Sequence, residues 1–320
     1  MPVSVLGIEI GGTKLQVVAG DGSGRILART RDAVDPAAGG AGIRTSLSRR
    51  LPGLLQEHGP VAVGVGFGGP VDWRTGRIGC SHQISGWNGF ELGAWLYAET
   101  GLPVHVDNDA NVAALGEAIC GSGRGASPVF WINMGSGVGG GLVVDGRIYH
   151  GAPPGEAEIG HLCLDKSGVR VEARCSGWAV DRRIREAIRQ HPEGPLATHL
   201  RPVGSCESRA LAPALADGDP LAQAILSELA DNLAFALSHA VQLFHPEVIV
   251  IGGGLSLIGE PLRAAIAAAL PAYVMNAFLP GPRIALAGLG EDSVPVGALA
   301  LAAGRVSRVV PAIAQFAPPA

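Results

Sequence analysis

Residues 106–117 read VDNDANVAALGE, so two carboxylates and two amides come directly before an alanine-rich stretch. We expect a strand to end at Val106 and a helix to cover Ala110–Cys120, which places Asp109 at a strand-to-helix turn near the helix N-terminus. An Asp at this position is often only an N-cap. Because Asn108 adds a donor and an acceptor, the pair can also hold hydroxyls of a polyol while Asp109 accepts a proton from one of them.

Composition and charge indicate a large α/β protein. The chain has 320 residues, a net charge of -4 and a pI near 6.1, so it lacks the basic character expected of a nucleic-acid partner. Apolar residues make up 47%, charged residues 16%, and 48 residues are glycine. This composition is typical of tightly packed α/β enzymes rather than of disordered chains.

The sequence favours a cytoplasmic protein without a membrane span. The longest uncharged runs, 126–144 and 264–282, are interrupted by glycine or proline clusters. The N-terminal residues 1–5 have no basic region and no cleavage site. The five cysteines are odd in number and scattered, which fits reduced thiols better than a disulfide framework.

A glycine turn follows the first apolar run, Val3–Ile10, and precedes a second run, Leu15–Ala19, which predicts a hairpin. Exposed backbone N–H groups, a hydroxyl and a lysine suit phosphate oxygens, although a plain tight hairpin has the same pattern. Glu9 faces the same turn and can hold a hydrated Mg²⁺. The residues of this turn are Gly11, Gly12, Thr13 and Lys14.

Two further glycine turns occur later in the chain. The run Val129–Met134 leads through the glycine-rich residues 135–141 into a second hairpin, roughly 120 residues after the first, which indicates a duplicated fold. Another turn follows Glu247–Ile251 and precedes a helix near 259–270, as in the nucleotide crevice of an open α/β sheet. This turn lacks the Gly-x-Gly-x-x-Gly spacing of a dinucleotide-binding fold, so we reject that fold. The phosphate-binding candidates are Gly135, Ser136, Gly137, Gly252, Gly253 and Gly254.

Seven segments occur in an order characteristic of one family. They are Gly7–Lys14, Gly68–Asp72, Gly86–Trp87, Asn108–Asn111, Gly135–Gly141, Glu158–His161 and Gly252–Gly254. In these segments, and over nearly its whole length, the chain resembles the ROK family of sugar kinases within the actin/hexokinase superfamily. The resemblance implies an α/β, two-lobed actin-like ATPase (ribonuclease H-like) fold, with duplicated mixed-sheet domains and an interdomain cleft.

The resemblance also implies an activity: phosphorylation of a hexose, of the glucose or N-acetylhexosamine type, at O6, with ATP and Mg²⁺. Asp109 is then the general base, Glu9 holds Mg²⁺ through water together with the ATP phosphates, and the protein is a homodimer. The implied sugar-binding residues are Gly69, Asn108, Asp109, Glu158 and His161. From the residues alone, Glu158 and His161 can also be a local i, i+3 pair, and we favour sugar contact because imidazole both donates and accepts.

One segment departs from the family. In most members three cysteines, in a Cys-x-Cys-Gly-x-x-Gly-Cys-x-Glu pattern, bind a structural zinc together with the histidine. Here residues 169–178 read VRVEARCSGW, so Cys175 is the thiol that remains in this stretch, and Cys163, before it, is a second candidate. Because a closed zinc site needs four ligands, we predict no structural zinc.

Without zinc, His161 needs another group to orient it. We expect Trp178, beside Val169 and Val171, to fill the space as an apolar plug, and the alternative is that the segment is a looser loop. Glu172 is a candidate for the family's sugar-binding glutamate by proximity alone.

We expect a small α/β domain from residues 1–113 plus 304–320 and a larger α/β domain from 114–303, with a helical insertion around 181–230. The alternative function is a noncatalytic sugar-binding sensor or regulator on the same fold. Some relatives carry a DNA-binding helix-turn-helix before the first strand, for which this chain leaves no room. Retention of Asp109 favours the kinase.

Overall fold

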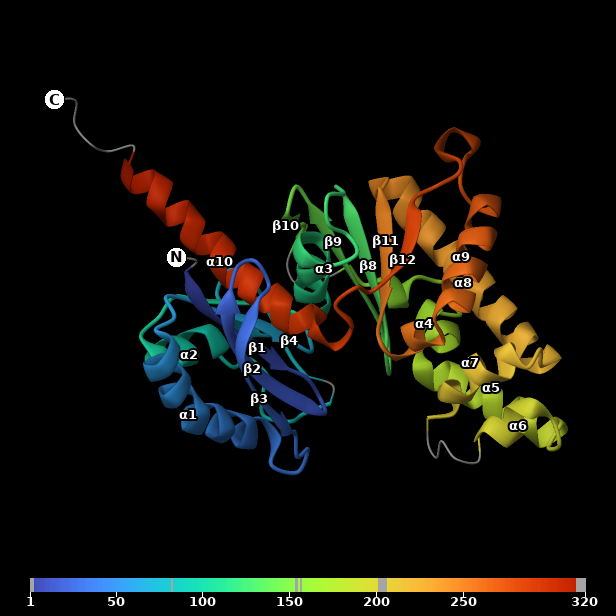
Figure 1. Cartoon of the computed structure of the whole chain (residues 1–320), viewed down its shortest axis with the longest axis horizontal. Helices are drawn as coiled ribbons and strands as arrows, with labels where there is room; N and C mark the ends of the chain where they lie inside the picture. The colour runs from blue at the N-terminus through green and yellow to red at the C-terminus, as the bar shows by residue number, and fades with distance from the viewer. Residues whose placement is uncertain (1–2, 82, 153–154, 156, 201–205, 315–320) are drawn as a thin grey trace. The chain divides into compact units, whose positions relative to one another are not determined.

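The structure is a computed structural model that describes residues 3–81, 83–152, 155, 157–200 and 206–314, with side chains described up to Gly304. The chain folds into two compact units (Figure 1). Unit 1 comprises Met1–Gly125, Gly146–Glu156 and Glu291–Ala320, and unit 2 comprises Ala126–Asp145 and Ala157–Gly290.

Unit 1 is built on a mixed five-stranded sheet of order β3-β2-β1-β4-β7. The first three strands of the chain pair antiparallel, whereas β1, β4 and β7 run parallel. The central strands β1 and β4 are almost wholly apolar and buried, as strands covered on both faces require. The strands are β1 (Ser4–Ile10), β2 (Lys14–Asp21), β3 (Ile26–Ala33), β4 (Val63–Phe67) and β7 (Val104–Asn108).

Helices cover both faces of this sheet because side chains alternate along each strand. On β1, Leu6 and Ile8 belong to the core shared with α1 and α2, whereas Val5 packs with Leu299 of α10. Helix α10 also packs closely on α3, where a Cβ at Gly297 would collide with the Val112 carbonyl. The remaining elements of unit 1 are α1 (Gly39–His58), β5 (Val71–Asp72), β6 (Arg77–Ile78), α2 (Leu92–Thr100), α3 (Asp109–Cys120), β10 (Arg147–Ile148) and α10 (Ser293–Ala314).

The strands of unit 2 repeat this pattern in the order β9-β8-β11-β12. Strands β8 and β9 form an antiparallel hairpin, and β8, β11 and β12 run parallel, matching β2-β1-β4-β7 of unit 1. The predicted duplication of a mixed sheet is therefore confirmed. These strands are β8 (Val129–Met134), β9 (Val138–Val144), β11 (Val248–Gly252) and β12 (Arg283–Leu286).

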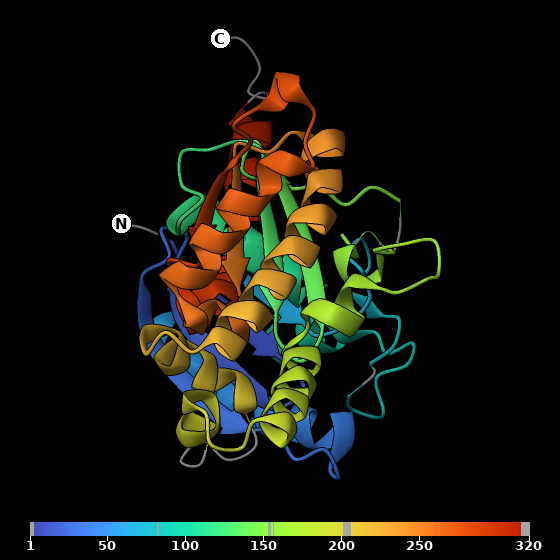
Figure 2. The same cartoon turned by 90° about the vertical axis from the view of Figure 1, so that its right-hand side faces the viewer.

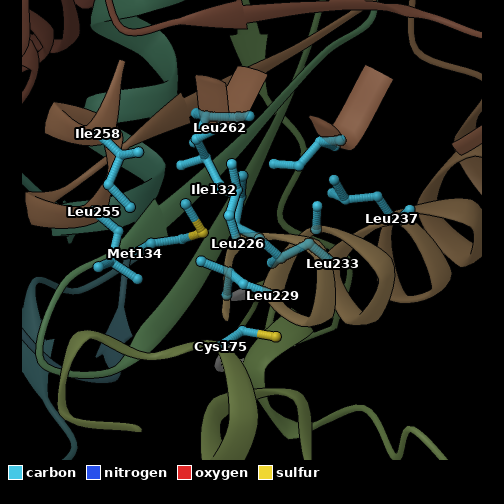
Figure 3. Packing of buried hydrophobic residues seen from close by; sticks show 14 of the residues in the cluster. Ile132, Met134, Cys175, Leu226, Leu229, Leu233, Leu237, Leu255, Ile258 and Leu262 are labelled. Carbon is cyan, nitrogen blue, oxygen red and sulfur yellow. The ribbon is translucent and has the colours of Figure 1, made fainter. Parts of the chain in front are cut away.

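The core of unit 2 forms between its sheet and helices α8 and α9, which run side by side (Figure 2). Leu226, Leu229, Leu233 and Leu237 of α8, spaced three or four residues apart, give one continuous apolar face that meets Ile132 and Met134 of β8 (Figure 3). The helices are α4 (Val171–Cys175), α5 (Gly177–Gln190), α6 (Pro195–Leu200), α7 (Leu211–Ala216), α8 (Pro220–Phe244) and α9 (Glu260–Ala269). Short 3-10 turns are η1 (Ile159–His161), η2 (Glu207–Ala210), η3 (Gly254–Ile258), η4 (Leu270–Ala272) and η5 (Asn276–Phe278), while η6 (Gly290–Asp292) lies at the end of the unit.

The boundaries of the two units differ from the expected domain boundaries at 113/114 and 303/304. Helix α3 stays whole within unit 1, and α10 belongs to unit 1 from its first residue. The reason is packing, since α3 and α10 contact each other and strand β4. The expected helical insertion at 181–230 corresponds to most of α5, then α6, α7 and the first half of α8 in unit 2. In the part of the chain that the structure describes, no helix combines the length and the apolar character needed to cross a membrane.

Candidate functional site

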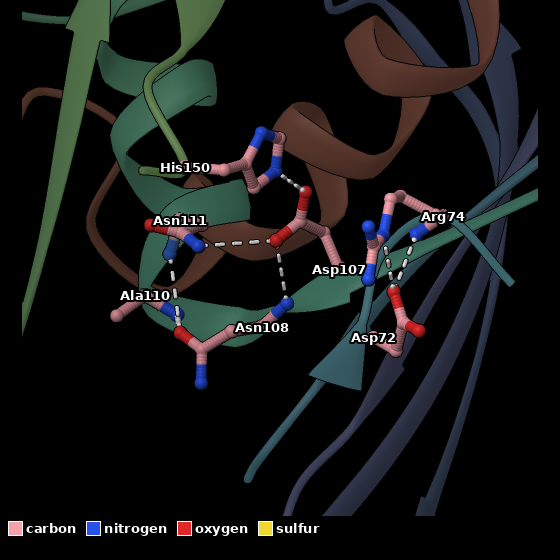
Figure 4. Close-up of polar contacts among 7 residues, drawn as sticks. All are labelled: Asp72, Arg74, Asp107, Asn108, Ala110, Asn111 and His150. Carbon is pink, nitrogen blue, oxygen red and sulfur yellow. Dashed lines mark hydrogen bonds and ion pairs between the residues drawn. The ribbon is translucent and has the colours of Figure 1, made fainter. Parts of the chain in front are cut away.

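The turn between β7 and α3 places Asp109 as the first residue of the helix. The N-cap is Asn108, whose Oδ1 accepts hydrogen bonds from the backbone N–H groups of Ala110 at 2.8 Å and Asn111 at 3.3 Å (Figure 4). The interpretation of Asp109 as the N-cap is therefore wrong, because an amide one residue earlier has that role. Asp109 keeps the position that the helix N-terminus favours for an anion.

The parallel strands β1, β4 and β7 end around the Asp109 carboxylate. Gly68 follows β4, donates its N–H to the Ile10 carbonyl at 2.9 Å, and faces Asp109 so closely that a Cβ built on it would lie 3.4 Å from Oδ2. The same Cβ would lie 3.7 Å from Cα of Gly11. Asn108 Nδ2 donates to the Gly69 carbonyl at 3.2 Å. The structure thus brings together Gly11, Gly69, Asn108 and Asp109 at the carboxyl ends of β1, β4 and β7, where open α/β sheets bind ligands.

A buried carboxylate holds the turn in shape. Asp107 Oδ1 accepts from Asn108 N at 2.9 Å and from Asn111 Nδ2 at 3.1 Å, and Oδ2 lies 2.6 Å from His150 Nε2 (Figure 4). The His150 ring stacks on Trp73, with centroids 4.2 Å apart. A buried carboxylate needs several hydrogen bonds, and these fix the backbone that carries Asp109. Sequence reasoning missed His150 because it lies 43 residues from Asp107 with no local pattern to mark it.

We expect His150→Ala to destabilise the fold by about 1–3 kcal/mol, because Asp107 Oδ2 would stay buried without its donor. Urea unfolding measures this loss. His150→Gln offers an amide N–H near the same place and should recover part of it. A His150→Ala protein as stable as the parent would show that the pair does not hold the turn.

The first glycine turn joins β1 to β2 and carries an ion pair. Lys14 Nζ lies 3.1 Å from Glu9 Oε1, and Gln16 Nε2 donates to Glu9 Oε2 at 2.8 Å. Burial raises the pKa of the Glu9 carboxyl above its ordinary value, against the opposing effect of Lys14. A Cβ at Gly12 would collide with Gln83 Oε1, so a side chain there requires the Gln83 side chain to move. The Mg²⁺ role of Glu9 and the phosphate role of this turn stay predictions.

In unit 2 the second glycine turn is fixed by two helices. Gly135 N donates to the Gly137 carbonyl at 3.0 Å, closing the turn between β8 and β9. Glu172 Oε2, on α4, accepts from Val138 N at 3.0 Å, and the Gly135 carbonyl accepts from Gly177 N at 2.7 Å, at the start of α5. The sequence offers Glu172 as a candidate sugar-binding glutamate by proximity alone. In the structure its carboxylate supports the second glycine turn directly.

The third glycine turn lies against the end of β8. A Cβ at Gly253, which has a φ of +80°, would lie 2.6 Å from both Asn133 Oδ1 and the Met134 carbonyl. A Cβ at Gly252 would collide with the Trp131 ring. Glycine at both positions lets β11 and β8 end side by side, so the two predicted phosphate turns of unit 2 lie together. Gly254 faces open space.

Glu158 is the N-cap of the short helix η1 and His161 is its last residue, and both are half exposed, with side-chain exposures of 53% and 55%. Their Oε2 and Nε2 atoms are 3.9 Å apart. His161 lies in an open pocket of about 640 Å³ that Ser136 of the second glycine turn also lines, together with Arg170, Glu172 and others. One pocket of unit 2 therefore contains a predicted sugar residue and a predicted phosphate residue.

The segment without the cysteine pattern is packed differently from expectation. Val171 is fully buried as expected, but Trp178 is 67% exposed, so its predicted role as an apolar plug is wrong. Trp178 lies on the first turn of α5 and lines the pocket. Cys175 instead belongs to the buried core of unit 2 (Figure 3). Burial raises the pKa of the Cys175 thiol to about 12, which disfavours the metal-binding thiolate. Among the described residues, no three His, Cys, Asp or Glu side chains are grouped to hold a metal.

The absence of a structural zinc stays a prediction, and elemental analysis tests it. We expect well under one zinc per purified chain, and no change in activity or melting temperature after prolonged chelation. A tightly held zinc in each chain, lost together with activity, would contradict the prediction.

Two α/β units, each with glycine turns at the carboxyl ends of its parallel strands, define the class of actin-like nucleotide-binding proteins. The ROK family profile matches residues 5–305. The chain is 33% identical over 307 residues to a glucokinase of Halalkalibacterium halodurans, covering 91% of this chain and 92% of that protein. It is 31% identical over 312 residues to a glucokinase of Streptomyces coelicolor, covering 93% of this chain and 96% of that protein.

Among solved structures, the chain is similar to a ROK family glucokinase from Streptomyces griseus in complex with glucose and AMPPNP. The TM-score is 0.80 with 30% identity, over 93% of this chain and 99% of that one. The protein belongs to the ROK family. The predicted family and fold class are confirmed.

Proposed function

We propose that the protein transfers the γ-phosphoryl group of ATP to O6 of a hexose of the glucose or N-acetylhexosamine type. The observation that carries this proposal is the gathering of Asp109, Asn108 and Gly69 with the first glycine turn at the ends of three parallel strands. The glucokinase relatives support the same reaction. They also favour catalysis over the alternative of a noncatalytic sugar-binding sensor.

In this proposal Asp109 is the general base. Its carboxylate accepts the proton of the O6 hydroxyl as that oxygen forms a bond to the γ-phosphorus and the bond to the ADP oxygen breaks. Asn108 orients the sugar, because its Nδ2 donates one N–H to Gly69 and has a second N–H for a hydroxyl. The cap bonds to Oδ1 prevent the amide from rotating.

The phosphate groups of ATP are held at the glycine turns. The proposed residues are Gly11, Gly12, Thr13 and Lys14 in unit 1 and Gly135, Ser136, Gly137, Gly252, Gly253 and Gly254 in unit 2. Among the residues that the structure describes, each Glu9 carboxylate oxygen has one hydrogen-bonding or ionic partner, which leaves lone pairs to accept from water. Glu9 therefore suits a hydrated Mg²⁺, which would neutralise charge on the β- and γ-phosphates when ATP is bound.

Glu158 and His161 are proposed to hold sugar hydroxyls from unit 2. Both side chains are half exposed, and the carboxylate offers acceptors beside an imidazole nitrogen. A hydroxyl can accept a hydrogen bond from one and donate to the other. Neutral, polyhydroxylated ligands suit such a pair.

A substrate panel tests the proposed function. Purified protein with MgATP should release ADP in the presence of at least one hexose or N-acetylhexosamine, and the rate should saturate with that sugar. ADP release that is the same with and without every sugar would contradict the proposal. The homodimer and the cytoplasmic location stay predictions, and light scattering on purified protein tests the first of them.

A further inference from the structure

Arg170 and His161 are joined by a hydrogen bond at the edge of the unit 2 pocket. Arg170 Nη1 lies 2.6 Å from His161 Nδ1, across a separation of nine residues. The backbone brings them together, because Val171 N donates to the Leu162 carbonyl at 2.9 Å and Leu164 N donates to the Val169 carbonyl at 2.7 Å. These two bonds close residues 162–171 into a loop, and the side chains of His161 and Arg170 lie at its base.

The chemistry of this contact fixes the tautomer of the histidine. A guanidinium group has five N–H donors and no acceptor, so Nδ1 of His161 must be the acceptor. A neutral imidazole that accepts at Nδ1 carries its proton on Nε2. The Nε2 atom is the one that lies 3.9 Å from Glu158 Oε2, so a donor faces an acceptor across a gap.

A single hydroxyl group can bridge the two atoms from beside the pair, because 3.9 Å is shorter than two hydrogen bonds placed end to end. A hydroxyl can accept from Nε2–H and donate to the Glu158 carboxylate, satisfying both groups. With the other tautomer, two acceptors would face the hydroxyl, which has one proton to donate. Trp178, which the sequence predicts to orient this ring, is 67% exposed. The contact to Nδ1 of His161 comes from Arg170 instead.

We propose that Arg170 is a positioning residue for sugar binding: by donating to Nδ1 it orients the His161 ring and keeps Nε2–H as the donor to a sugar hydroxyl. The inference rests on the proposed function, in which His161 contacts the sugar. The Arg170 side chain supplies a cation at the ring nitrogen, so this loop needs no metal ion to orient the histidine.

The test compares Arg170→Met with Arg170→Gln, which keeps an N–H donor, and with a control, Arg183→Met. Arg183 lies on α5, is not among the described residues that line this pocket, and donates from Nε to Glu228 Oε2 at 3.2 Å. Arg170→Met should raise KM for the sugar by about tenfold, as expected for the loss of one good hydrogen bond, with KM for ATP unchanged. Arg170→Gln should recover part of the loss, and Arg183→Met should leave KM for the sugar at the parental value.

Ring nitrogen NMR supplies a readout that does not depend on turnover. The parent should show His161, assigned by comparison with His161→Gln, with an unprotonated Nδ1 and a protonated Nε2, and Arg170→Met should show a mixture of the two tautomers. Equal spectra for both proteins, or an unchanged KM for the sugar in Arg170→Met, would overturn the inference.

Failure of the proposed function is distinguishable from failure of this inference. If the parent phosphorylates no sugar, the proposed function fails, while the NMR result still decides whether Arg170 sets the tautomer. If the parent is active and His161→Gln leaves KM for the sugar unchanged, the kinase proposal stands and the role of Arg170 in sugar binding is overturned.

Discussion

Asp109→Asn should lower kcat by about 100-fold or more while the protein stays folded, because the amide keeps the shape of the side chain but cannot accept the proton. The structure gives a reason to expect an intact fold: the helix cap is Asn108, whose bonds to Ala110 N and Asn111 N do not involve residue 109. Steady-state kinetics with MgATP and saturating sugar measures the effect, and thermal melting checks the fold.

A matched control is Asp35→Asn, which makes the same chemical change at an exposed loop residue that accepts from Ala37 N. It should retain the parental kcat. Full activity in Asp109→Asn would remove Asp109 from the role of base, and an equal loss in both variants would point to a general effect of the substitution.

Gly137→Val should weaken ATP binding by about tenfold or more and leave sugar binding nearly unchanged. A Cβ at this position would lie 2.5 Å from Glu172 Oε2, the atom that accepts from Val138 N. The new side chain therefore displaces the support of the glycine turn and also obstructs the approach of a phosphate to the backbone. Titration calorimetry with a non-hydrolysable ATP analogue and, separately, with the sugar measures both affinities.

Gly53→Val is the control, because a Cβ at Gly53 on α1 meets nothing within 4 Å. It should leave both affinities at the parental values. If Gly137→Val folds, keeps its affinity for the sugar and still binds the ATP analogue as the parent does, the turn has a structural role alone.

The strands and glycine turns could be predicted because their signals are local. Apolar runs ended by glycine gave β1, β2, β8, β9 and β11, and the duplicated pattern of two mixed sheets followed from the repeat of that signal. Asp109 could be placed at a helix start for the same reason. Its neighbour Asn108, and not Asp109, became the cap, because the helix begins one residue earlier than the pattern of apolar residues indicates.

The features that the sequence did not predict depend on contacts between residues that no local pattern connects. Nothing near His150 in the sequence marks it as the partner of Asp107, and nothing near Arg170 marks it as the partner of His161. Trp178 was expected inside because aromatic residues favour burial, yet the start of α5 turns it toward the pocket. The unit boundaries likewise followed from the packing of α3 on α10, which the chain brings together across some 170 residues.

The central claim is that a phosphoryl group passes from ATP to O6 of a hexose with Asp109 as base. Carbon and phosphorus NMR of the product from MgATP and the best sugar of the panel tests it most directly. We expect ADP and a sugar phosphate in equal amounts, with phosphorus coupling at C6, and almost none of either with Asp109→Asn. ADP formed with inorganic phosphate alone, or a phosphate on another carbon, would contradict the claim.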